Sequence, residues 1–244
     1  MQIDFGVSTS QGRVRTSNED SYAADLANRL FLVADGMGGH AAGEIASRMA
    51  ATAVEQFVAG ERTVAGSLGE LLLRAAQAAN SRIYDAQCHK PELSGMGSTL
   101  TALALSDSTY HIAHVGDSRA YLLRAGVLDQ LTRDHSLVWH LFENGMLGKD
   151  ELSSHPQKNL ITRSIGPHLN VEVDIECGEA HEGDTFLLCS DGLTDVLSDE
   201  DLRQKLSNAD ASPQQLGDDL VREANARGGP DNITVIVIRI RPDR

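Results

Sequence analysis

Four aspartates stand where predicted β-strands meet turns, and each has a glycine beside it or two residues away: Asp35, Asp117, Asp191 and Asp231. One such aspartate carries little information, because Asp is common in turns and at helix N-caps. Strand ends in one sheet layer lie near each other, so the four carboxylates are expected to converge. Carboxylate oxygens without a Cys or His cluster favour Mg²⁺ or Mn²⁺ over zinc or copper. The pattern therefore predicts a site for hard divalent cations.

The stretch around Asp35 shows how such a site is built. Residues 30–34 form a short apolar run, which predicts a buried strand that ends at Asp35 and Gly36. Gly36, Gly38 and Gly39 allow the backbone to turn tightly and to approach a ligand closely. Close carboxylates repel each other unless they are protonated or shared by cations. Two cations bridged by a carboxylate can activate a water for in-line attack at phosphorus, so metal-assisted hydrolysis of a phosphate ester is the expected chemistry.

Arg15 and His40 are the candidate partners of a phosphate substrate. The guanidinium of Arg15 can grip two phosphate oxygens and stays charged at every working pH. The alternative for Arg15 is a surface salt bridge within its own polar turn, which also holds Glu19 and Asp20. His40 lies in the glycine turn after Asp35 and could donate a proton. The alternative for His40 is a turn position without a catalytic role.

The order of the predicted elements favours an α+β fold. Apolar and alternating runs predict strands at residues 2–8, 30–35, 100–105, 110–115, 120–123, 171–175, 185–189 and 233–240. Helical spacing predicts helices at residues 42–58, 67–86, 135–144, 198–206 and 213–227. This order does not alternate strictly, which favours antiparallel sheets with segregated helices. The polar and irregular segment 132–166 is expected to be a functional flap.

Composition argues against several other classes of protein. The 244 residues include 21 Lys or Arg and 35 Asp or Glu, and the net charge of −14 argues against binding to a nucleic-acid backbone. No apolar run has transmembrane length and the N-terminus lacks a secretory pattern, so no membrane association and a cytoplasmic location are expected. Cys88, Cys177 and Cys189 have no paired spacing, which argues against a disulfide framework and against a zinc site.

Six motifs, in order and over nearly the whole chain, resemble those of the metal-dependent serine/threonine phosphatases, the protein phosphatase 2C (PPM) family, in its short bacterial form. They are Arg15-x-x-x-Glu19-Asp20, Val33-Ala34-Asp35-Gly36-Met37-Gly38-Gly39, Gly97-Ser98-Thr99, Val115-Gly116-Asp117-Ser118-Arg119, Ser190-Asp191-Gly192 and Gly229-Pro230-Asp231-Asn232. The resemblance implies one domain over residues 1–244, folded as a four-layer α-β-β-α sandwich of two antiparallel sheets flanked by helices. Segment 132–166 resembles the family's flap, with Asp134-His135-Ser136 and His155-Pro156-x-x-Asn159-x-x-Thr162-Arg163 as its recurring pieces.

The resemblance also implies metal ligands, for two ions of Mn²⁺ or Mg²⁺ and for a third, weaker one. Asp35 would bridge two ions, and Gly36 would add its backbone carbonyl. Asp191 and Asp231 would complete the first site. Asp117 matches the acidic residue that helps to hold the third ion together with Asp191.

Other matching positions imply supporting roles. Glu19 and Asp20 would hold metal-bound waters, and Arg15 would bind the substrate phosphate. Many eukaryotic members carry a histidine, assigned as the general acid, directly after the Asp-Gly pair, where this chain has Met37. The resemblance therefore leaves the general acid unassigned, and His40 is a nearby substitute.

The expected function is hydrolysis of phosphoserine and phosphothreonine in proteins through a metal-activated water, by a monomer that opposes a bacterial Ser/Thr kinase. A first alternative is a pseudophosphatase, a fold retained as a binding module. The intact carboxylate set argues against this, because a binding module gains nothing from clustered repulsion. A second alternative is a metal-dependent phosphodiesterase or small-molecule phosphatase, and a phosphothreonine peptide tested against a cyclic nucleotide would discriminate between them.

Overall fold

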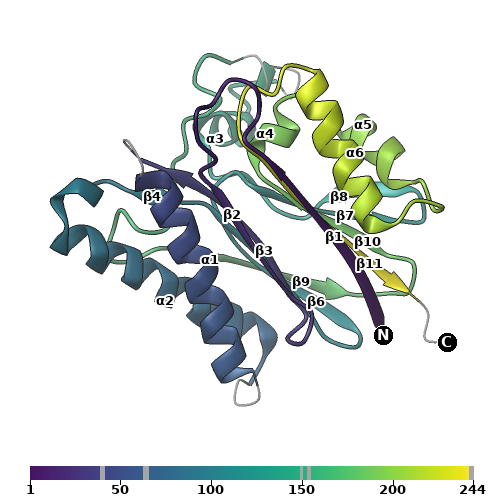
Figure 1. Ribbon diagram of the computed structural model, residues 1–244, viewed down its shortest axis with the longest axis horizontal. Coiled ribbons are helices and arrows are strands. Elements are labelled where there is room, and N and C mark those ends of the chain that lie inside the picture. The colour runs from purple at the N-terminus through teal and green to yellow at the C-terminus, as the bar shows by residue number, and fades with distance from the viewer. Residues whose placement is uncertain (39–41, 63–65, 149–150, 153–154, 242–244) are drawn as a thin grey trace.

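The computed structural model describes residues 1–38, 42–62, 66–148, 151–152 and 155–241, with two antiparallel sheets between layers of helices (Figure 1). The five-stranded sheet has the order β1-β11-β10-β7-β8, and the six-stranded sheet has the order β2-β3-β5-β6-β9 with β4 paired to β3. The strands are β1 (Gln2–Ser10), β2 (Asp20–Asp25), β3 (Leu30–Met37), β4 (Gly97–Ser98), β5 (Leu100–Leu105), β6 (Thr109–Val115), β7 (Arg119–Arg124), β8 (Val127–Gln130), β9 (Asp174–Glu179), β10 (Thr185–Cys189) and β11 (Ile233–Arg241).

Helices cover the outer face of each sheet. The long helices α1 (Ala42–Glu61) and α2 (Leu68–His89) pack on the six-stranded sheet. The five-stranded sheet is covered by α4 (Asp191–Thr194), α5 (Asp199–Leu206) and α6 (Pro213–Ala226). Two further helical segments are α3 (Leu137–Glu143) and the 3₁₀ turn η1 (Pro91–Leu93).

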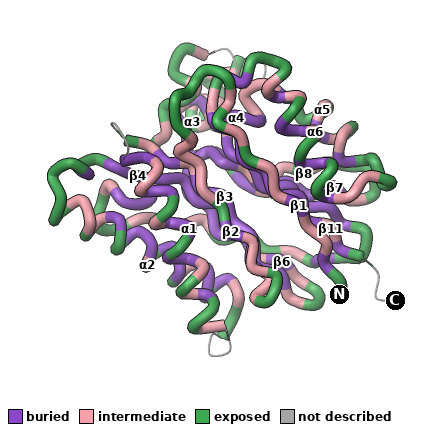
Figure 2. The backbone as a smooth tube through the Cα atoms, viewed as in Figure 1, coloured by how far each residue is buried: buried purple, intermediate pink, exposed green. Residues whose placement is uncertain are grey.

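Successive side chains of β3 point alternately into two different hydrophobic cores. Leu30, Leu32 and Ala34 belong to the core under α1 and α2. Phe31 and Val33, which point to the opposite face, belong to the core between the two sheets. Both faces are apolar because both are buried, and Figure 2 shows the buried segments concentrated in the two sheets. The α+β four-layer sandwich expected from the sequence is confirmed.

Several strand boundaries differ from the prediction. β3 does not end at Asp35 but runs on to Met37, because β4 pairs with Gly36 and Met37. The strands β2 and β8 were not predicted, since each is an edge strand with little apolar content. The strand predicted at residues 171–175 begins only at Asp174, where pairing with β6 starts.

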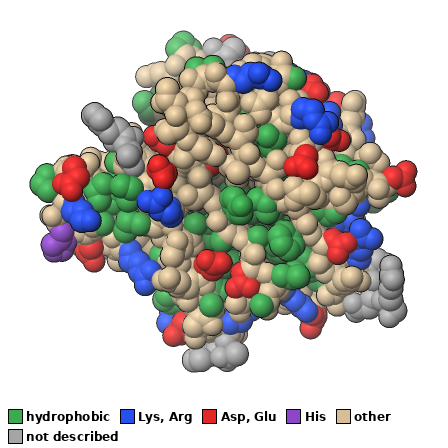
Figure 3. All heavy atoms as spheres, in the orientation of Figure 1, with side chains coloured by type: hydrophobic (Ala, Val, Ile, Leu, Met, Phe, Trp, Pro, Cys, Tyr) green, Lys and Arg blue, Asp and Glu red, His purple; other side chains and the backbone are tan. Residues whose placement is uncertain are grey.

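The two sheets meet the surface along one side of the sandwich. β1 and β2 are edge strands of different sheets, and in the space-filling view hydrophobic side chains gather on the face where these two strands lie (Figure 3). Phe5 and Val7 of β1 pack from this side against the core between the sheets. Within the described part of the chain, no helix has the length and apolar character needed to cross a membrane.

Candidate metal centre

The predicted carboxylates come together, but from both sheets rather than from one sheet layer. Asp35 lies in β3, and Asp117 follows β6, in the six-stranded sheet. Asp191 follows β10 and begins α4, and Asp231 precedes β11, in the five-stranded sheet. The two sheets therefore each bring two carboxylates to the same end of the sandwich. The expectation of a single sheet layer was wrong, because strands on either side of the central core end at this place.

Asp20 faces Asp35 directly, because the two residues are cross-strand partners in the β2–β3 pair. The backbone of Asp35 is held on its other side by the segment after β4. Its N–H donates to Thr99 Oγ1 at 2.8 Å, and its carbonyl oxygen accepts from the Thr99 N–H at 2.8 Å and from Ser98 Oγ at 3.0 Å. Asp35 is thus fixed from both sides without any use of its own carboxylate.

The carboxylates raise one another's pKa. Burial, followed by the charges of Asp20 and Asp191, raises the pKa of Asp35 well above its ordinary value. Burial and the charge of Asp117 do the same to the pKa of Asp191. Burial raises the pKa of Asp117 to about 7 and that of Asp20 to about 6. Crowded, desolvated carboxylates of this kind are stabilised in their charged form by a cation.

Three buried oxygens of the cluster have no hydrogen-bond partner among the described residues: Asp20 Oδ1, Asp117 Oδ1 and Asp191 Oδ1. A buried acceptor without a partner is costly, so a site that holds three of them suits an electropositive group. All the donors are oxygens, which suits Mg²⁺ or Mn²⁺. Among the described residues, no group of three or more His, Cys, Asp or Glu side chains is already arranged to hold a metal ion. Asp231 is instead paired, since its Oδ2 lies 2.6 Å from Arg15 NH2.

Gly36 and Glu19 lie where helix α1 begins. A Cβ at position 36 would collide with the carbonyl oxygen of Gly43, so the backbone approach of α1 to β3 requires glycine here. The Gly36 N–H donates to the Glu19 carbonyl oxygen at 3.1 Å, and the Glu19 carboxylate lies beside Gly43. Burial raises the pKa of Glu19. Asn232 anchors this turn, because its side chain accepts from the Glu19 N–H at 2.8 Å and donates to the Ser17 carbonyl at 2.8 Å.

The predictions for Arg15 and His40 have different outcomes. The side chain of Arg15 is 54% exposed and pairs with Asp231, not with the neighbouring Glu19 or Asp20 as the alternative had it. Its side chain therefore reaches the carboxylate cluster at Asp231, while about half of that side chain stays open to solvent. His40 lies outside the described residues, so its expected role stays a prediction.

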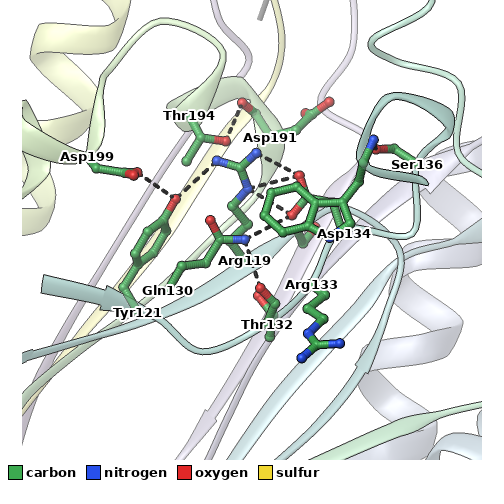
Figure 4. A network of polar contacts seen from close by, with 12 residues as sticks. Arg119, Tyr121, Gln130, Thr132, Arg133, Asp134, Ser136, Asp191, Thr194 and Asp199 are labelled. Atoms are coloured by element: carbon green, nitrogen blue, oxygen red, sulfur yellow. Dashed lines mark hydrogen bonds and ion pairs between the residues drawn. The ribbon is translucent and has the colours of Figure 1, made fainter. Parts of the chain in front are cut away.

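Beside Asp117 and Asp191, a second polar network surrounds Arg119 (Figure 4). Arg119 binds the Asp134 carboxylate through Nε at 2.9 Å and through NH2 at 2.6 Å, and Gln130 Nε2 donates to the same carboxylate at 3.2 Å. Arg119 NH1 donates to Tyr121 Oη at 3.1 Å. Both oxygens of the Asp134 carboxylate are thus hydrogen-bonded, whereas Oδ1 of Asp117 has no partner among the described residues. Of these two aspartates, Asp117 is therefore the one available to a cation.

A cavity of about 520 Å³ adjoins the cluster, and Asp117 and Asp191 are among the residues that line it. The segment predicted as a flap also lines it, through residues such as Trp139 and Lys158. Lys158 Nζ pairs with Asp195 Oδ2 at 2.8 Å, and both residues line this cavity. Arg119, Tyr121 and Gln130 were not predicted as site residues, since a network of paired side chains leaves no local signal in a sequence.

The model of the protein phosphatase 2C family matches residues 8–227 of the chain. The serine/threonine protein phosphatase PstP of Mycobacterium tuberculosis is 41% identical over 235 residues, which are 96% of this chain but 44% of that protein. The chain thus spans less than half the length of that relative. The serine/threonine phosphatase stp of Listeria monocytogenes is 39% identical over 238 residues, covering 94% of this chain and 93% of that protein.

Solved structures agree with these matches. The crystal structure of Mycobacterium tuberculosis PstP superposes with a TM-score of 0.92 at 40% identity and covers 98% of this chain and 99% of that one. The catalytic domain of PstP in complex with two manganese ions superposes with a TM-score of 0.89 at 38% identity, over 98% and 99% of the two chains. The chain belongs to the protein phosphatase 2C family, as its ordered motifs predicted.

Proposed function

We propose that this protein is a metal-dependent phosphatase that hydrolyses phosphoserine and phosphothreonine in proteins. The observation that carries the proposal is the set of three buried, unpartnered carboxylate oxygens on Asp20, Asp117 and Asp191 around Asp35. Family membership supports the same reaction class. The named relatives are serine/threonine phosphatases, and one of their structures holds two manganese ions.

Each predicted ligand has a place in this proposal. Asp35, the Gly36 carbonyl, Asp191 and Asp231 would hold two ions of Mn²⁺ or Mg²⁺, and Asp117 would hold a third together with Asp191. When bound, these ions would lower the pKa of a water and neutralise charge on the phosphate oxygens. Ionised Asp20 and Glu19 would orient water beside the ions.

Arg15 would bind the phosphate of the substrate. Its side chain is about half exposed and its guanidinium already pairs with one anion, Asp231, at 2.6 Å, so a phosphate could share or replace that partner. His40 would donate a proton to the serine or threonine oxygen as it leaves. In that case His40→Ala should slow a phosphopeptide by about 10²- to 10⁴-fold while nearly sparing p-nitrophenyl phosphate, whose leaving group needs no proton. Equal losses on both substrates would argue against His40 as the acid.

We further propose that residues 1–244 act as one catalytic domain and that residues 132–166 act as its flap. Support comes from the cavity beside the cluster, which Trp139 and Lys158 of that segment help to line. A phosphopeptide chain would lie in this cavity with its phosphate towards Asp117 and Asp191. A bacterial Ser/Thr kinase and its substrates are the proposed partners, and we propose a monomer acting in the cytoplasm.

The test compares a phosphothreonine peptide with a cyclic nucleotide, each with Mn²⁺ and with chelator. The proposal expects release of phosphate from the peptide that requires Mn²⁺ and no turnover of the cyclic nucleotide. Preference for the cyclic nucleotide would establish a phosphodiesterase instead. Peptide binding without turnover at any Mn²⁺ concentration would establish a pseudophosphatase.

A further inference from the structure

His135 lies at the start of the flap segment and makes two hydrogen bonds with Gly116, the residue before Asp117. The backbone N–H of His135 donates to the Gly116 carbonyl oxygen at 2.7 Å. The Gly116 N–H in turn donates to the ring Nδ1 of His135 at 3.1 Å. The His135 side chain is 9% exposed, so water does not compete for these bonds. Both backbone groups of Gly116 are thus satisfied by one residue that lies 19 positions away.

The opposite edge of the His135 ring is hydrogen-bonded as well. Since Nδ1 accepts from Gly116, the proton of the neutral ring sits on Nε2, which donates to Asp174 Oδ2 at 3.2 Å. Arg163 NH1 donates to the second oxygen of Asp174 at 2.7 Å and also lies 3.0 Å from Nε2, so these three groups form one cluster. The His114 ring lies against His135 with centroids 4.8 Å apart. Burial lowers the pKa of His135, which favours the neutral ring that these bonds need.

Gly116 depends on these hydrogen bonds because its backbone has a positive φ. Its φ is +113°, in the region that favours glycine, and a Cβ there would lie 2.6 Å from the side chain of Thr99. The next residue, Asp117, has a buried Oδ1 with no hydrogen-bond partner among the described residues, so that oxygen does not anchor its side chain. On the far side, Ser118 Oγ bonds to Thr99 Oγ1 at 2.8 Å. The position of the Asp117 carboxylate is therefore set by Ser118 on one side and by His135 on the other.

The same histidine joins the two ends of the flap segment. The His135 carbonyl oxygen accepts from the Thr162 N–H at 2.8 Å, and the Leu137 N–H donates to the Leu160 carbonyl at 2.9 Å. A displacement of either flap end would move His135, and through it Gly116.

We propose that His135 is a positioning residue that fixes the Gly116–Asp117 backbone and so couples the flap to the proposed third-ion carboxylate. This inference rests on the proposed function. The bond that matters is the one from the Gly116 N–H to the ring Nδ1, whereas the bond from Nε2 to Asp174 only orients the ring.

Two isosteric variants separate these bonds. In His135→Asn, the side-chain oxygen stands where Nδ1 was and still accepts from the Gly116 N–H, but the contact with Asp174 is lost. In His135→Gln, the amide nitrogen stands where Nε2 was and still donates to Asp174, but Gly116 loses its acceptor. Leaving a buried N–H without a partner has a cost that corresponds to about 10-fold or more in an equilibrium.

The expected result is a ranking of phosphopeptide turnover measured against Mn²⁺ concentration. His135→Asn should keep turnover within about twofold of wild type, whereas His135→Gln should need about 10-fold more Mn²⁺ for half-maximal rate. In an Asp117→Ala background, His135→Gln should have no additional effect, because the carboxylate that it positions is gone. Equal behaviour of the Asn and Gln variants, or a full additional loss in the Asp117→Ala background, would overturn the proposal.

Amide hydrogen exchange of the wild-type protein is a second test that needs no variant and no activity. The Gly116 amide should be protected to about the level of neighbouring β6 amides. Fast exchange at Gly116 would refute its bond to His135 even if both variants fold poorly. If the wild type shows no metal-dependent hydrolysis, the proposed function fails, and the exchange result still decides the role of His135 at Gly116.

Discussion

Binding of Mn²⁺ to this protein should weaken steeply as the pH falls. The pKa of Asp117 is raised to about 7 and that of Asp20 to about 6, mainly by burial. At about pH 5.5 both groups are protonated, and ionising them costs about 2 and about 1 kcal/mol respectively, whereas at about pH 8 both are already charged. The combined cost of about 3 kcal/mol corresponds to at least about 100-fold weaker binding at the lower pH. Asp35 and Asp191, whose pKa values are also raised, act in the same direction.

The stability of the metal-free protein should increase as the pH falls, whereas Mn²⁺ binding weakens. A carboxyl group with a raised pKa binds its proton more tightly in the folded than in the unfolded state. Its contribution to the free energy of unfolding is therefore full at low pH and is lost as the pH rises through the folded value, about 7 for Asp117. The melting temperature without metal should fall between about pH 5 and pH 8, while the rise caused by Mn²⁺ should grow.

Calorimetric titration with Mn²⁺ at several pH values, in buffers of different ionisation enthalpy, measures both the affinity and the protons released. Asp117→Asn is the control, and it should remove the part of the pH dependence that comes from Asp117. An Mn²⁺ affinity that stays the same between about pH 5.5 and pH 8 would refute the reasoning. It would mean either that the cluster does not receive the ion or that its carboxyl groups are already ionised without it.

Three further predictions concern single side chains. Asp35→Asn should abolish turnover yet melt at or above the wild-type temperature without metal, because repulsion from Asp20 and Asp191 is removed; retained turnover would contradict this. Arg15→Ala should raise KM by about 10- to 100-fold and change kcat little, since its bond to a charged phosphate forms before the transition state; a fall in kcat alone would contradict it. Alkylation should modify the exposed Cys88 and Cys177 and leave activity intact. Cys189 should not react, because burial raises the pKa of its thiol to about 12.

The elements that depend on local signals were predictable from the sequence. The alternating and apolar runs of β1, β5, β10 and β11 predicted these strands to within about two residues. Helical spacing did the same for α1, α2, α5 and α6 to within about three residues. Ser198 and Ser212 cap α5 and α6 in capping boxes, which are themselves local patterns. The identities of the clustered aspartates were also available, because each lies in a short motif.

Elements that exist only through pairing were not predictable in this way. β2 is an edge strand of mixed polarity, and nothing in its own residues favours a strand over a turn. It forms because β3 offers it a partner, and that pairing places Asp20 opposite Asp35. The continuation of β3 to Met37 has the same origin, since β4 lies about 60 residues further along the chain.

The sequence by itself therefore determined which aspartates belong to the ordered motifs, whereas the tertiary structure decided which side chains meet and in what state. Arg15 pairs with Asp231 although 216 positions separate them. The raised pKa values of Asp117 and Asp20 come from burial, which no local pattern records. The bonds between His135 and Gly116 likewise depend on the segment after β8 returning to the end of β6. Residue types are local properties, but burial, pairing and charge repulsion depend on distances that only the folded chain sets.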